Sequence, residues 1–387
     1  MRIALLTGDL SRKGAGVREV VEGLSVGLSG LGHTVEVFGL ETSEWINGDE
    51  LVWNGTQAHA CQVRGPASLG YAPDMFARLR AFDPDVVHVH GIWQYPSRVA
   101  LQWHAATGRP IFTSPHGMLH PMALAQARAK KWLVRRLYVD ALINRSAALV
   151  GATSEEVEHI AAFRGRGSIV ERPNGVVLPP DAGPLRAPAP WQGELSDEAP
   201  VMLFLGRFHH TKNLDALLDA WAFLHQAGQL HDWQLAIAGW GAAEAEAHVR
   251  TKAERIIAKG ARIALTGPLF GADKHAALQN ASGFILPSLN ESFAISVLEA
   301  WGAKLPTLLS AACNMGFAVE GGAAFEVRTM PGDLAADIRT FLSLELAARR
   351  KMGLRGYDLV HQRFSWPVVA KLYEGLYEGG DGDVLSG

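Results

Sequence analysis

The stretch VMLFLGRFHHTKNLDALLDAWAFLHQAG, residues 201–228, decides the fold class of this chain. It opens with five apolar residues, Val201 to Leu205, which is the length and composition of a buried strand. A polar loop follows, and from residue 213 to 228 apolar side chains recur at helical spacing. A second apolar strand is expected at 234–238. Strand, helix and strand in this order predict a parallel βαβ unit.

The same alternation runs through both halves of the chain. In the first half a helix is expected over 16–30, and strands are expected at 2–7, 34–40, 86–90, 111–114 and 148–152. In the second half strands at 201–205, 234–238, 262–266 and 284–287 alternate with helices at 213–228, 242–259, 272–281 and 293–303. This order predicts two Rossmann-like α/β domains with parallel sheets. Because such sheets bind ligands at the carboxyl ends of their strands, the domains are expected to face a central cleft.

A proline-rich stretch separates the two halves. Its prolines are Pro173, Pro179, Pro180, Pro184, Pro188, Pro190 and Pro200. Proline punctuates regular structure, so this composition is typical of a linker. We therefore expect an N-terminal domain at 1–178, a linker at 179–200 and a C-terminal domain at 201–365.

Composition excludes several classes of protein. Lys and Arg number 36 against 39 Asp and Glu, a net charge of −3, which does not suggest a nucleic-acid partner. The two cysteines, Cys61 and Cys313, are far apart and lack zinc-ligand spacing, which fits a reducing compartment. No apolar run is long enough to span a bilayer, and the first strand is too short for a signal peptide. We expect a cytoplasmic protein, with contact at the inner face of the membrane left open.

The loop after the strand at 201–205 carries two cations, Arg207 and Lys212. It lies at the carboxyl end of a strand and directly before a helix. Two fixed cations beside a helix N-terminus form a diphosphate site. The alternative is a solvated basic loop.

Two glutamates, Glu291 and Glu299, stand eight residues apart around the start of the next expected helix. Glu299 lies in an apolar stretch, and a buried carboxylate there needs hydrogen-bond partners, which ligand hydroxyls would supply. Eight residues at helical rise span roughly 12 Å, about the reach from the ribose to the sugar of a nucleotide diphosphate sugar. Free amides at residues 292–294 would face a phosphate. The alternative is an N-cap glutamate and a surface glutamate.

In this order these motifs, with Gly239-Trp240-Gly241 and Leu265-Thr266-Gly267, resemble glycosyltransferase family 4. The resemblance implies a retaining enzyme of GT-B architecture, with Glu291 and Glu299 as the E-x7-E motif. It also implies that a helix over about 366–380 packs back on the first domain. One departure is Ala294, which stands where the family has glycine.

The resemblance also implies a set of site residues. The expected catalytic residues are His116, Arg207, Lys212 and Glu291. The expected donor-binding residues are Gly14, Ala15, Gly16, Arg207, Lys212, Leu269, Ser292, Phe293, Ala294, Ile295 and Glu299.

The Gly14-Ala15-Gly16 stretch follows the first strand. A dinucleotide fingerprint would need a small residue where Glu19 stands, which disfavours a nicotinamide-dependent oxidoreductase. By resemblance this stretch lies over the donor phosphates; the alternative is a flexible loop.

Three histidines, His88, His90 and His116, stand at strand ends. We discount a metal site there, because no acidic ligand accompanies them and we assign alternate strand residues to opposite faces. By resemblance His116 contacts the donor sugar. His90 is expected to line the acceptor side, and His88 to have a structural role.

Residues 121–145 are expected to form one long basic amphipathic helix. Its cations are Arg128, Lys130, Lys131, Arg135, Arg136 and Arg145, opposed only by Asp140 and interleaved with Trp132, Leu133, Leu137 and Tyr138. Such a patch can bind an anionic membrane or an anionic acceptor. The alternative is an ordinary exposed face.

These features favour a metal-independent retaining glycosyltransferase, without a cofactor. It would move a hexosyl unit from a UDP-, GDP- or ADP-sugar to a sugar, lipid-linked or other small acceptor in bacterial polysaccharide or glycolipid synthesis. The alternatives are a nucleotide-sugar epimerase or phosphorylase on the same frame, and a non-catalytic sugar-binding protein.

Overall fold

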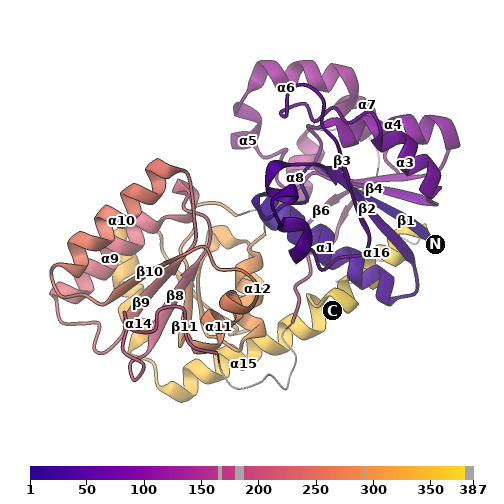
Figure 1. The fold of residues 1–387 in the computed structure, drawn as a ribbon. Helices are drawn as coiled ribbons and strands as arrows, with labels where there is room; N and C mark the ends of the chain where they lie inside the picture. The colour runs from indigo at the N-terminus through magenta and orange to yellow at the C-terminus, as the bar shows by residue number, and fades with distance from the viewer. Residues whose placement is uncertain (164–167, 179–186, 292, 380–387) are drawn as a thin grey trace. The chain divides into compact units, whose positions relative to one another are not determined.

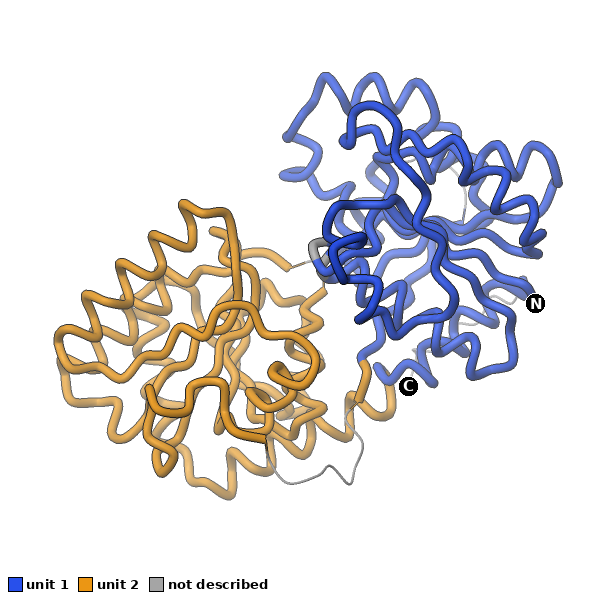
Figure 2. The backbone as a smooth tube through the Cα atoms, viewed as in Figure 1, with its two compact units in different colours: residues 1–176, 364–387 blue, residues 177–363 orange. Residues whose placement is uncertain are grey.

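The computed structural model describes residues 1–163, 168–178, 187–291 and 293–379, without the side chains of Lys13 and Ala15. The chain divides into two compact units, drawn in different colours in Figure 2. Unit 1 comprises Met1–Val176 and Phe364–Gly387, and unit 2 comprises Val177–Arg363. Each unit is described by itself below.

Unit 1 is built on a parallel seven-stranded sheet of order β3-β2-β1-β4-β5-β6-β7. The strands are β1 (Arg2–Thr7), β2 (Thr34–Leu40), β3 (Ala58–Cys61), β4 (Val86–His90), β5 (Ile111–Ser114), β6 (Ala148–Gly151) and β7 (Ser168–Glu171). The expected strands of the first half all occur, with β6 one residue shorter. The sequence pattern missed β3 and β7, because these edge strands have four residues each and are mostly half-buried. They therefore lack a continuous apolar run.

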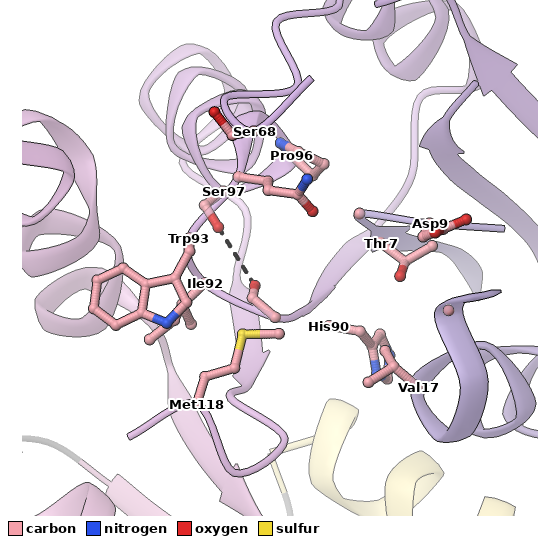
Figure 3. Close-up of a pocket in the computed structure, with 14 residues that line it drawn as sticks. Thr7, Asp9, Val17, Ser68, His90, Ile92, Trp93, Pro96, Ser97 and Met118 are labelled. Carbon is pink, nitrogen blue, oxygen red and sulfur yellow. Dashed lines mark hydrogen bonds between the residues drawn. The ribbon is translucent and has the colours of Figure 1, made fainter. Parts of the chain in front are cut away.

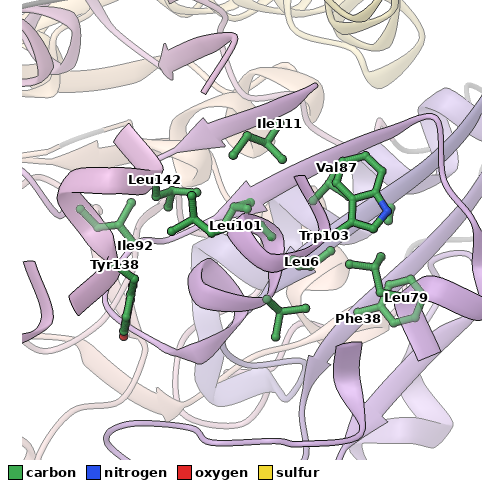
Figure 4. Close-up of a cluster of buried hydrophobic side chains, with 14 of the residues drawn as sticks. Leu6, Phe38, Leu79, Val87, Ile92, Leu101, Trp103, Ile111, Tyr138 and Leu142 are labelled. Carbon is green, nitrogen blue, oxygen red and sulfur yellow. The ribbon is translucent and has the colours of Figure 1, made fainter. Parts of the chain in front are cut away.

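Helices cover both faces of this sheet (Figure 1). On one face lie α3 (Met75–Phe82), α4 (Tyr95–Thr107) and α7 (Asp140–Arg145). Their side chains pack with those of β1, β2 and β4 in the apolar core shown in Figure 4, which includes Leu6, Phe38, Leu79 and Trp103. Burial of each such side chain contributes roughly 1.5–3 kcal/mol to folding.

The C-terminal helix α16 (Trp366–Tyr377) packs in unit 1 against α1 (Ala15–Gly30). Trp366 lies so close to α1 that a Cβ atom on Gly23 would come within 1.9 Å of its indole nitrogen. The contact is also polar, since His33 Nε2 lies 2.8 Å from Glu374 Oε1. The end of the chain thus completes the core of unit 1.

Unit 2 is built on a parallel six-stranded sheet of order β10-β9-β8-β11-β12-β13. The strands are β8 (Val201–Leu205), β9 (Gln234–Ala238), β10 (Ile263–Gly267), β11 (Gly283–Leu286), β12 (Thr307–Ser310) and β13 (Ala324–Val327). The main helices are α9 (Leu214–Gln226), α10 (Ala243–Ile257), α11 (Gly271–Asn280), α12 (Ile295–Gly302), α14 (Pro331–Leu342) and α15 (Leu346–Arg363). The two sheets confirm the expected pair of Rossmann-like α/β domains. The sequence pattern missed β12 and β13.

The expected linker at 179–200 lies partly outside the described residues, which omit 179–186. Its described part is packed onto unit 2: Trp191 is buried, and the buried Gln234 side chain hydrogen-bonds the backbone of Ser196 at 2.8 and 2.9 Å. Residues 187–200 therefore belong to unit 2 in structure.

The expected single helix over 121–145 is wrong. The segment forms α5 (Pro121–Ala125), α6 (Arg128–Val134), a π-helical turn (Arg135–Val139) and α7. The break falls at Ala127, whose φ of 50° lies in the left-handed region and costs an alanine about 1–2 kcal/mol. Lys131 offsets part of this cost by donating across the break to the Ala123 carbonyl. Nothing in the local sequence, such as glycine or proline, marks the break.

Candidate active-site groups on each unit

In unit 2 the loops after β8 and β9 lie against each other at the carboxyl ends of those strands. The amide of Gly206 donates to Ala238 O at 3.0 Å, and that of Phe208 donates to Trp240 O at 2.6 Å. Gly239 has a φ of 155°, and a Cβ atom there would lie 1.8 Å from Gly206 O. Only glycine allows this approach, so Gly239 helps to place the loop that carries Arg207 and Lys212.

The Lys212 loop is also tied to the loop after β11. His210–Lys212 form a single 3-10 turn, and Asn213 follows with a left-handed φ of 58°. The Asn213 side-chain amide donates to Pro287 O at 3.1 Å, and Leu289 N donates to Thr211 O at 2.7 Å. These bonds bring together two sequence motifs that are some 80 residues apart.

Glu291 is the buried acceptor at this junction, with 8% of its surface exposed. Its Oε1 accepts hydrogen bonds from Lys212 Nζ and, at 2.7 Å, from Ser288 Oγ. Asn314 Nδ2 donates to its backbone carbonyl at 3.0 Å. From the sequence, Lys212 and Glu291 were expected as separate ligand contacts, and the ion pair that joins them was not predicted.

Glu299 has a protein partner that the sequence analysis did not foresee. Its Oε1 lies 2.5 Å from Nζ of Lys274 on α11, and both side chains are largely buried. Lys274 thus supplies one partner of this carboxylate, and the expected contact with ligand hydroxyls stays a prediction. Lys274 could have been found as a cation on the helix before the motif.

The start of α12 differs from the expectation. The helix begins at Ile295, because Ala294 has φ −85° and ψ 76°, outside the helical region. The amides expected at a helix start, 292–294, therefore precede it, and Ser292 lies outside the described residues. The rise of 1.5 Å per residue does not apply before residue 295, so the 12 Å span is not supported. Phe293 O accepts from Ile295 N at 3.1 Å, and Ala294 is buried.

Arg207 is exposed on the β8 loop and has no ion-pair partner within the described residues. Next to it, burial and then the charges of His210, Arg207 and Lys212 lower the pKa of His209. Leu269 is half-buried, and the neighbouring Phe270 ring lies 5.3 Å from the ring of Trp240.

In unit 1 the Gly14–Gly16 stretch is ordered as a turn and a helix start. Arg12–Gly14 form one 3-10 turn, and α1 begins at Ala15. A Cβ atom on Gly14 would lie 3.1 Å from Asp9 O, a tight contact that favours a small residue there. The expected contact of this segment with the donor phosphates stays a prediction.

The three histidines come together in unit 1, and our assignment of alternate strand residues to opposite faces is wrong. Residues two apart on a strand share a face, so the His88 and His90 rings lie 4.2 Å apart. His90 Nδ1 lies 2.9 Å from His116 Nε2. His88 is fully satisfied, by Tyr377 OH at 2.7 Å and Ser114 Oγ at 2.9 Å, which is a structural role.

Burial keeps all three imidazoles neutral at physiological pH. It lowers the pKa of His116 to about 4 and, with the charge of His116, that of His88 to about 3. The pKa of His90 is also well below its ordinary value, because of burial and then of its histidine neighbours. His116 has a φ of 53°, a strained conformation that places its ring beside His90.

A pocket of about 350 Å³ opens beside this cluster, at the ends of β1 and β4 (Figure 3). His90, Trp93, Asp9, Gln94 and Met118 are among its lining residues. The buried atoms His90 Nε2 and Trp93 Nε1 have no hydrogen-bond partner in the described part of the chain. A buried polar atom of this kind is costly unless a water or ligand completes its hydrogen bonding. Of these residues, only His90 was expected from the sequence.

Glu156 holds the His116 loop in place and was also missed. It lies on α8 (Ser154–Phe163) and accepts from Gly117 N at 2.6 Å and from Ala152 N at 2.9 Å. Burial raises the pKa of this carboxyl, while the two amides oppose that shift.

The basic segment 121–145 combines exposed cations with exposed apolar side chains. Trp132 and Leu137 are 62% and 60% exposed, and Leu133 lies between them in sequence, also exposed. We call these three and the exposed Arg128, Lys130 and Arg136 the basic-apolar surface. Tyr138 is buried and so does not belong to it. Lys131 and Arg135 have partners within unit 1, in Ala123 O and Asp140.

Comparison with known proteins assigns the class. The family model described as "Glycosyl transferase 4-like domain" matches residues 15–181, and the model "Glycosyl transferases group 1" matches residues 199–343. Solved structures share the fold over nearly the whole chain. Sucrose-phosphate synthase from Thermosynechococcus elongatus has a TM-score of 0.72 at 19% identity, covering 98% of both chains. Anabaena Alr3699/HepE, in complex with UDP and glucose, has a TM-score of 0.75 at 14% identity, covering 98% of this chain and 100% of that one.

The chain is therefore a glycosyltransferase of the GT-B type, with a 4-like first domain and a group 1 second domain. A curated relative is the GDP-mannose-dependent alpha-mannosyltransferase of Mycolicibacterium smegmatis, 26% identical over 98% of this chain and 97% of that protein. Another is the GDP-mannose:cellobiosyl-diphosphopolyprenol alpha-mannosyltransferase of Xanthomonas oryzae pv. oryzae, 30% identical over 64% of this chain and 60% of that protein.

Proposed function

We propose that this glycosyltransferase moves a hexosyl unit from a nucleotide diphosphate sugar to an acceptor hydroxyl with retention of anomeric configuration. The observation that carries the proposal is the Lys212–Glu291 pair at the carboxyl ends of β8 and β11. The pair places a cation next to a carboxylate. The cation suits the anionic diphosphate of a nucleotide sugar, and the carboxylate suits the hydroxyls of its sugar. The names of relatives that use GDP-mannose, and a structural neighbour bound to UDP, support this donor class.

The charge of the leaving group explains the role of the cations. A departing nucleoside diphosphate gains negative charge in the transition state, and fixed cations stabilise that charge. We infer that Lys212 turns from Glu291 toward the diphosphate and that Arg207 provides the second cation. Glu291 then accepts hydrogen bonds from sugar hydroxyls. These two cations supply the charge stabilisation that a metal ion supplies elsewhere, so we propose metal-independent transfer.

Retention would follow from attack on the face from which the diphosphate departs. In that step the acceptor oxygen forms the bond to the anomeric carbon as the bond to the diphosphate oxygen breaks. The acceptor proton passes to the departing phosphate oxygen. Ser288 still donates to Glu291 when Lys212 turns away, which suits positioning of the sugar better than nucleophilic attack.

The pocket of unit 1 is our proposed acceptor site. His90 Nε2 and Trp93 Nε1 are buried polar atoms that hydroxyl groups would satisfy, and Asp9 and Gln94 add further polar contacts. Apolar walls with a few placed polar groups are typical of small-molecule sites. A saccharide, free or lipid-linked, fits this combination.

The basic-apolar surface supports transfer at an anionic membrane. Exposed Trp and Leu side chains enter the interface, while Lys and Arg are attracted to anionic headgroups. Within the described residues, no helix combines the length and hydropathy needed to cross a bilayer. We propose peripheral binding at the cytoplasmic face and a role in bacterial surface polysaccharide or glycolipid synthesis.

A donor screen tests the function directly. The purified chain is incubated with UDP-, GDP- and ADP-hexoses and candidate saccharide acceptors, and NMR follows the donor and the new anomeric proton. We expect one donor to be consumed, with release of the nucleoside diphosphate and a product of unchanged anomeric configuration. Inversion would exclude the retaining mechanism. Rearrangement of the donor without an acceptor would indicate an epimerase. Donor binding without turnover would indicate a sugar-binding protein.

A further inference from the structure

Unit 1 holds a second histidine cluster, distinct from the one beside the pocket. It consists of His120, Glu155 and His159, whose potential ligand atoms all lie within 4.8 Å of one another. Glu155 and His159 are four residues apart on α8, so they share one face of that helix. His120 immediately precedes α5 and comes from the loop after β5.

The three side chains already face one another. His120 Nε2 lies 3.9 Å from Glu155 Oε1. The rings of His120 and His159 meet edge to face, with their centroids 4.7 Å apart. All three are half-buried, so a bound ion would be partly shielded while remaining accessible from solvent. The proposed glycosyl transfer uses none of them.

We propose that His120, Glu155 and His159 bind a divalent transition-metal ion of the zinc class. Two imidazoles and one carboxylate are a common ligand set for Zn²⁺, with water in the fourth position. Calcium and magnesium prefer oxygen ligands, so the two nitrogens disfavour them. At Zn–ligand distances of about 2.0–2.2 Å, tetrahedral ligands lie about 3.4 Å apart. The present separations therefore need closing by little more than 1 Å, which side-chain rotation provides.

Metal coordination by His120 requires no loss of a proton from its neutral ring, only a move of that proton between the two ring nitrogens. Its Nδ1 accepts from Met122 N at 3.2 Å, so in the neutral ring the proton is on Nε2. Coordination through Nε2 moves that proton to Nδ1, and the Met122 amide loses a long hydrogen bond. Met122 is 50% exposed, so water can replace the lost acceptor.

The site would cross-link the loop that carries His116 to α8. Glu156, next to Glu155, already hydrogen-bonds Gly117 in that loop. A metal at His120 would add a second attachment four residues beyond His116. We therefore expect metal binding to stabilise unit 1 and to order the His116 loop.

Metal binding can be measured without reference to activity. The full chain is dialysed against EDTA and titrated with Co²⁺, followed by its visible d–d absorption, and with Zn²⁺, followed by calorimetry. We expect one ion per chain, a tetrahedral Co²⁺ spectrum, and a rise in the unfolding temperature on the order of 5 °C at saturating Zn²⁺.

Single substitutions assign the site. His120→Ala, His159→Ala and Glu155→Gln should each weaken Zn²⁺ binding at least tenfold. Glu158→Gln changes an exposed carboxylate one residue before His159 and should leave binding unchanged. The unfolding temperature of each variant without metal verifies that it is folded. If the wild type binds neither ion, or if His159→Ala and His120→Ala retain wild-type affinity, the proposal is wrong. Neither result bears on glycosyl transfer, which is measured separately.

Discussion

At the residue scale, unit 2 holds two largely buried carboxylates that each face a lysine. Lys212 pairs with Glu291, and Lys274 pairs with Glu299. Separating a largely buried pair leaves an unpartnered charge, which is costly. A ligand that replaces one partner must therefore offer the same charge, as a diphosphate does to Lys212, or equivalent hydrogen bonds, as hydroxyls do to a glutamate.

Lys212→Ala should lower turnover on the order of 10²-fold or more, because a fixed donor to the leaving group is lost. It should also reduce stability by about 1–3 kcal/mol, since Glu291 stays buried with fewer partners. The matched control is Arg207→Ala, which should lower turnover with little change in unfolding temperature, as Arg207 is exposed. Steady-state kinetics and thermal unfolding provide the two readouts. Wild-type turnover in Lys212→Ala would remove the diphosphate assignment.

Glu299→Gln should weaken binding of the donor and of the free nucleoside diphosphate alike, by about 1–3 kcal/mol, if Glu299 binds the ribose hydroxyls. Lys274→Ala is the control, because it removes the protein partner of Glu299 while keeping the carboxylate. Calorimetry with both ligands measures the effect. Weaker binding of the sugar-bearing donor alone would place Glu299 at the sugar instead. Equal losses in both variants would indicate that only the ion pair matters.

At the scale of elements, the ends of β4 and β5 bring three neutral histidines together. Their native pKa values lie below the ordinary value of about 6.5, so the unfolded chain binds more protons than the native chain as the pH falls. Stability from this cluster is thus complete above about pH 7 and is lost on acidification toward pH 4. This change of stability with pH is opposite in direction to that of a histidine paired with a carboxylate, whose contribution is lost as the pH rises.

Thermal unfolding between pH 7.5 and pH 4 tests this linkage. The unfolding temperature should fall steadily below about pH 6.5. His116→Gln should flatten that dependence, because one group with a lowered pKa is gone. Gln also retains a hydrogen-bonding group near His90, which limits the loss of packing. An unchanged pH dependence in the variant would show that His116 titrates normally in the folded chain.

The segment from α6 to α7 is where membrane binding is expected. Lys130→Glu with Arg136→Glu should abolish binding to anionic vesicles, because each exposed cation contributes about 1 kcal/mol near the surface. Lys131 and Arg135 are poorer choices, since both have partners within unit 1. Co-sedimentation at low and high salt measures binding, which should weaken as salt screens the charges. Donor hydrolysis should be unchanged. A wild type that ignores anionic vesicles at low salt would exclude membrane docking.

At the scale of the whole molecule, unit 1 is discontinuous in sequence. Residues 364–379 return to it after unit 2 and contribute α16, whose Val369, Tyr373 and Tyr377 are buried. A chain ending at Arg363 should therefore unfold at a markedly lower temperature or be insoluble. Tyr377→Phe is the control: it keeps the ring but loses the hydroxyl bonded to His88, a cost of about 1 kcal/mol. A truncated chain with wild-type stability would contradict this account of unit 1.

The sequence by itself determined the alternation of strands and helices, and with it most strands of both sheets and their parallel class. Periodicity is a local property: five apolar residues at Val201–Leu205 specify a buried strand whatever the rest of the chain does. The same reasoning placed Lys212 and Glu291 after strands, hence at the carboxyl ends of a parallel sheet. Short edge strands such as β3 were not predicted, because their half-buried residues do not form the apolar run that indicates a buried strand.

Only the tertiary structure decided which side chains meet. Strand order sets β8 beside β11, and this brings Lys212 to Glu291 across 79 residues of sequence. Packing of neighbouring elements likewise brings His90 to His116, and His120 to the side chains of α8. The left-handed turn at Ala127 likewise has its compensating contact elsewhere, in Lys131. Such contacts depend on how elements pack in space. The spacing of residues along one segment carries no information about that packing.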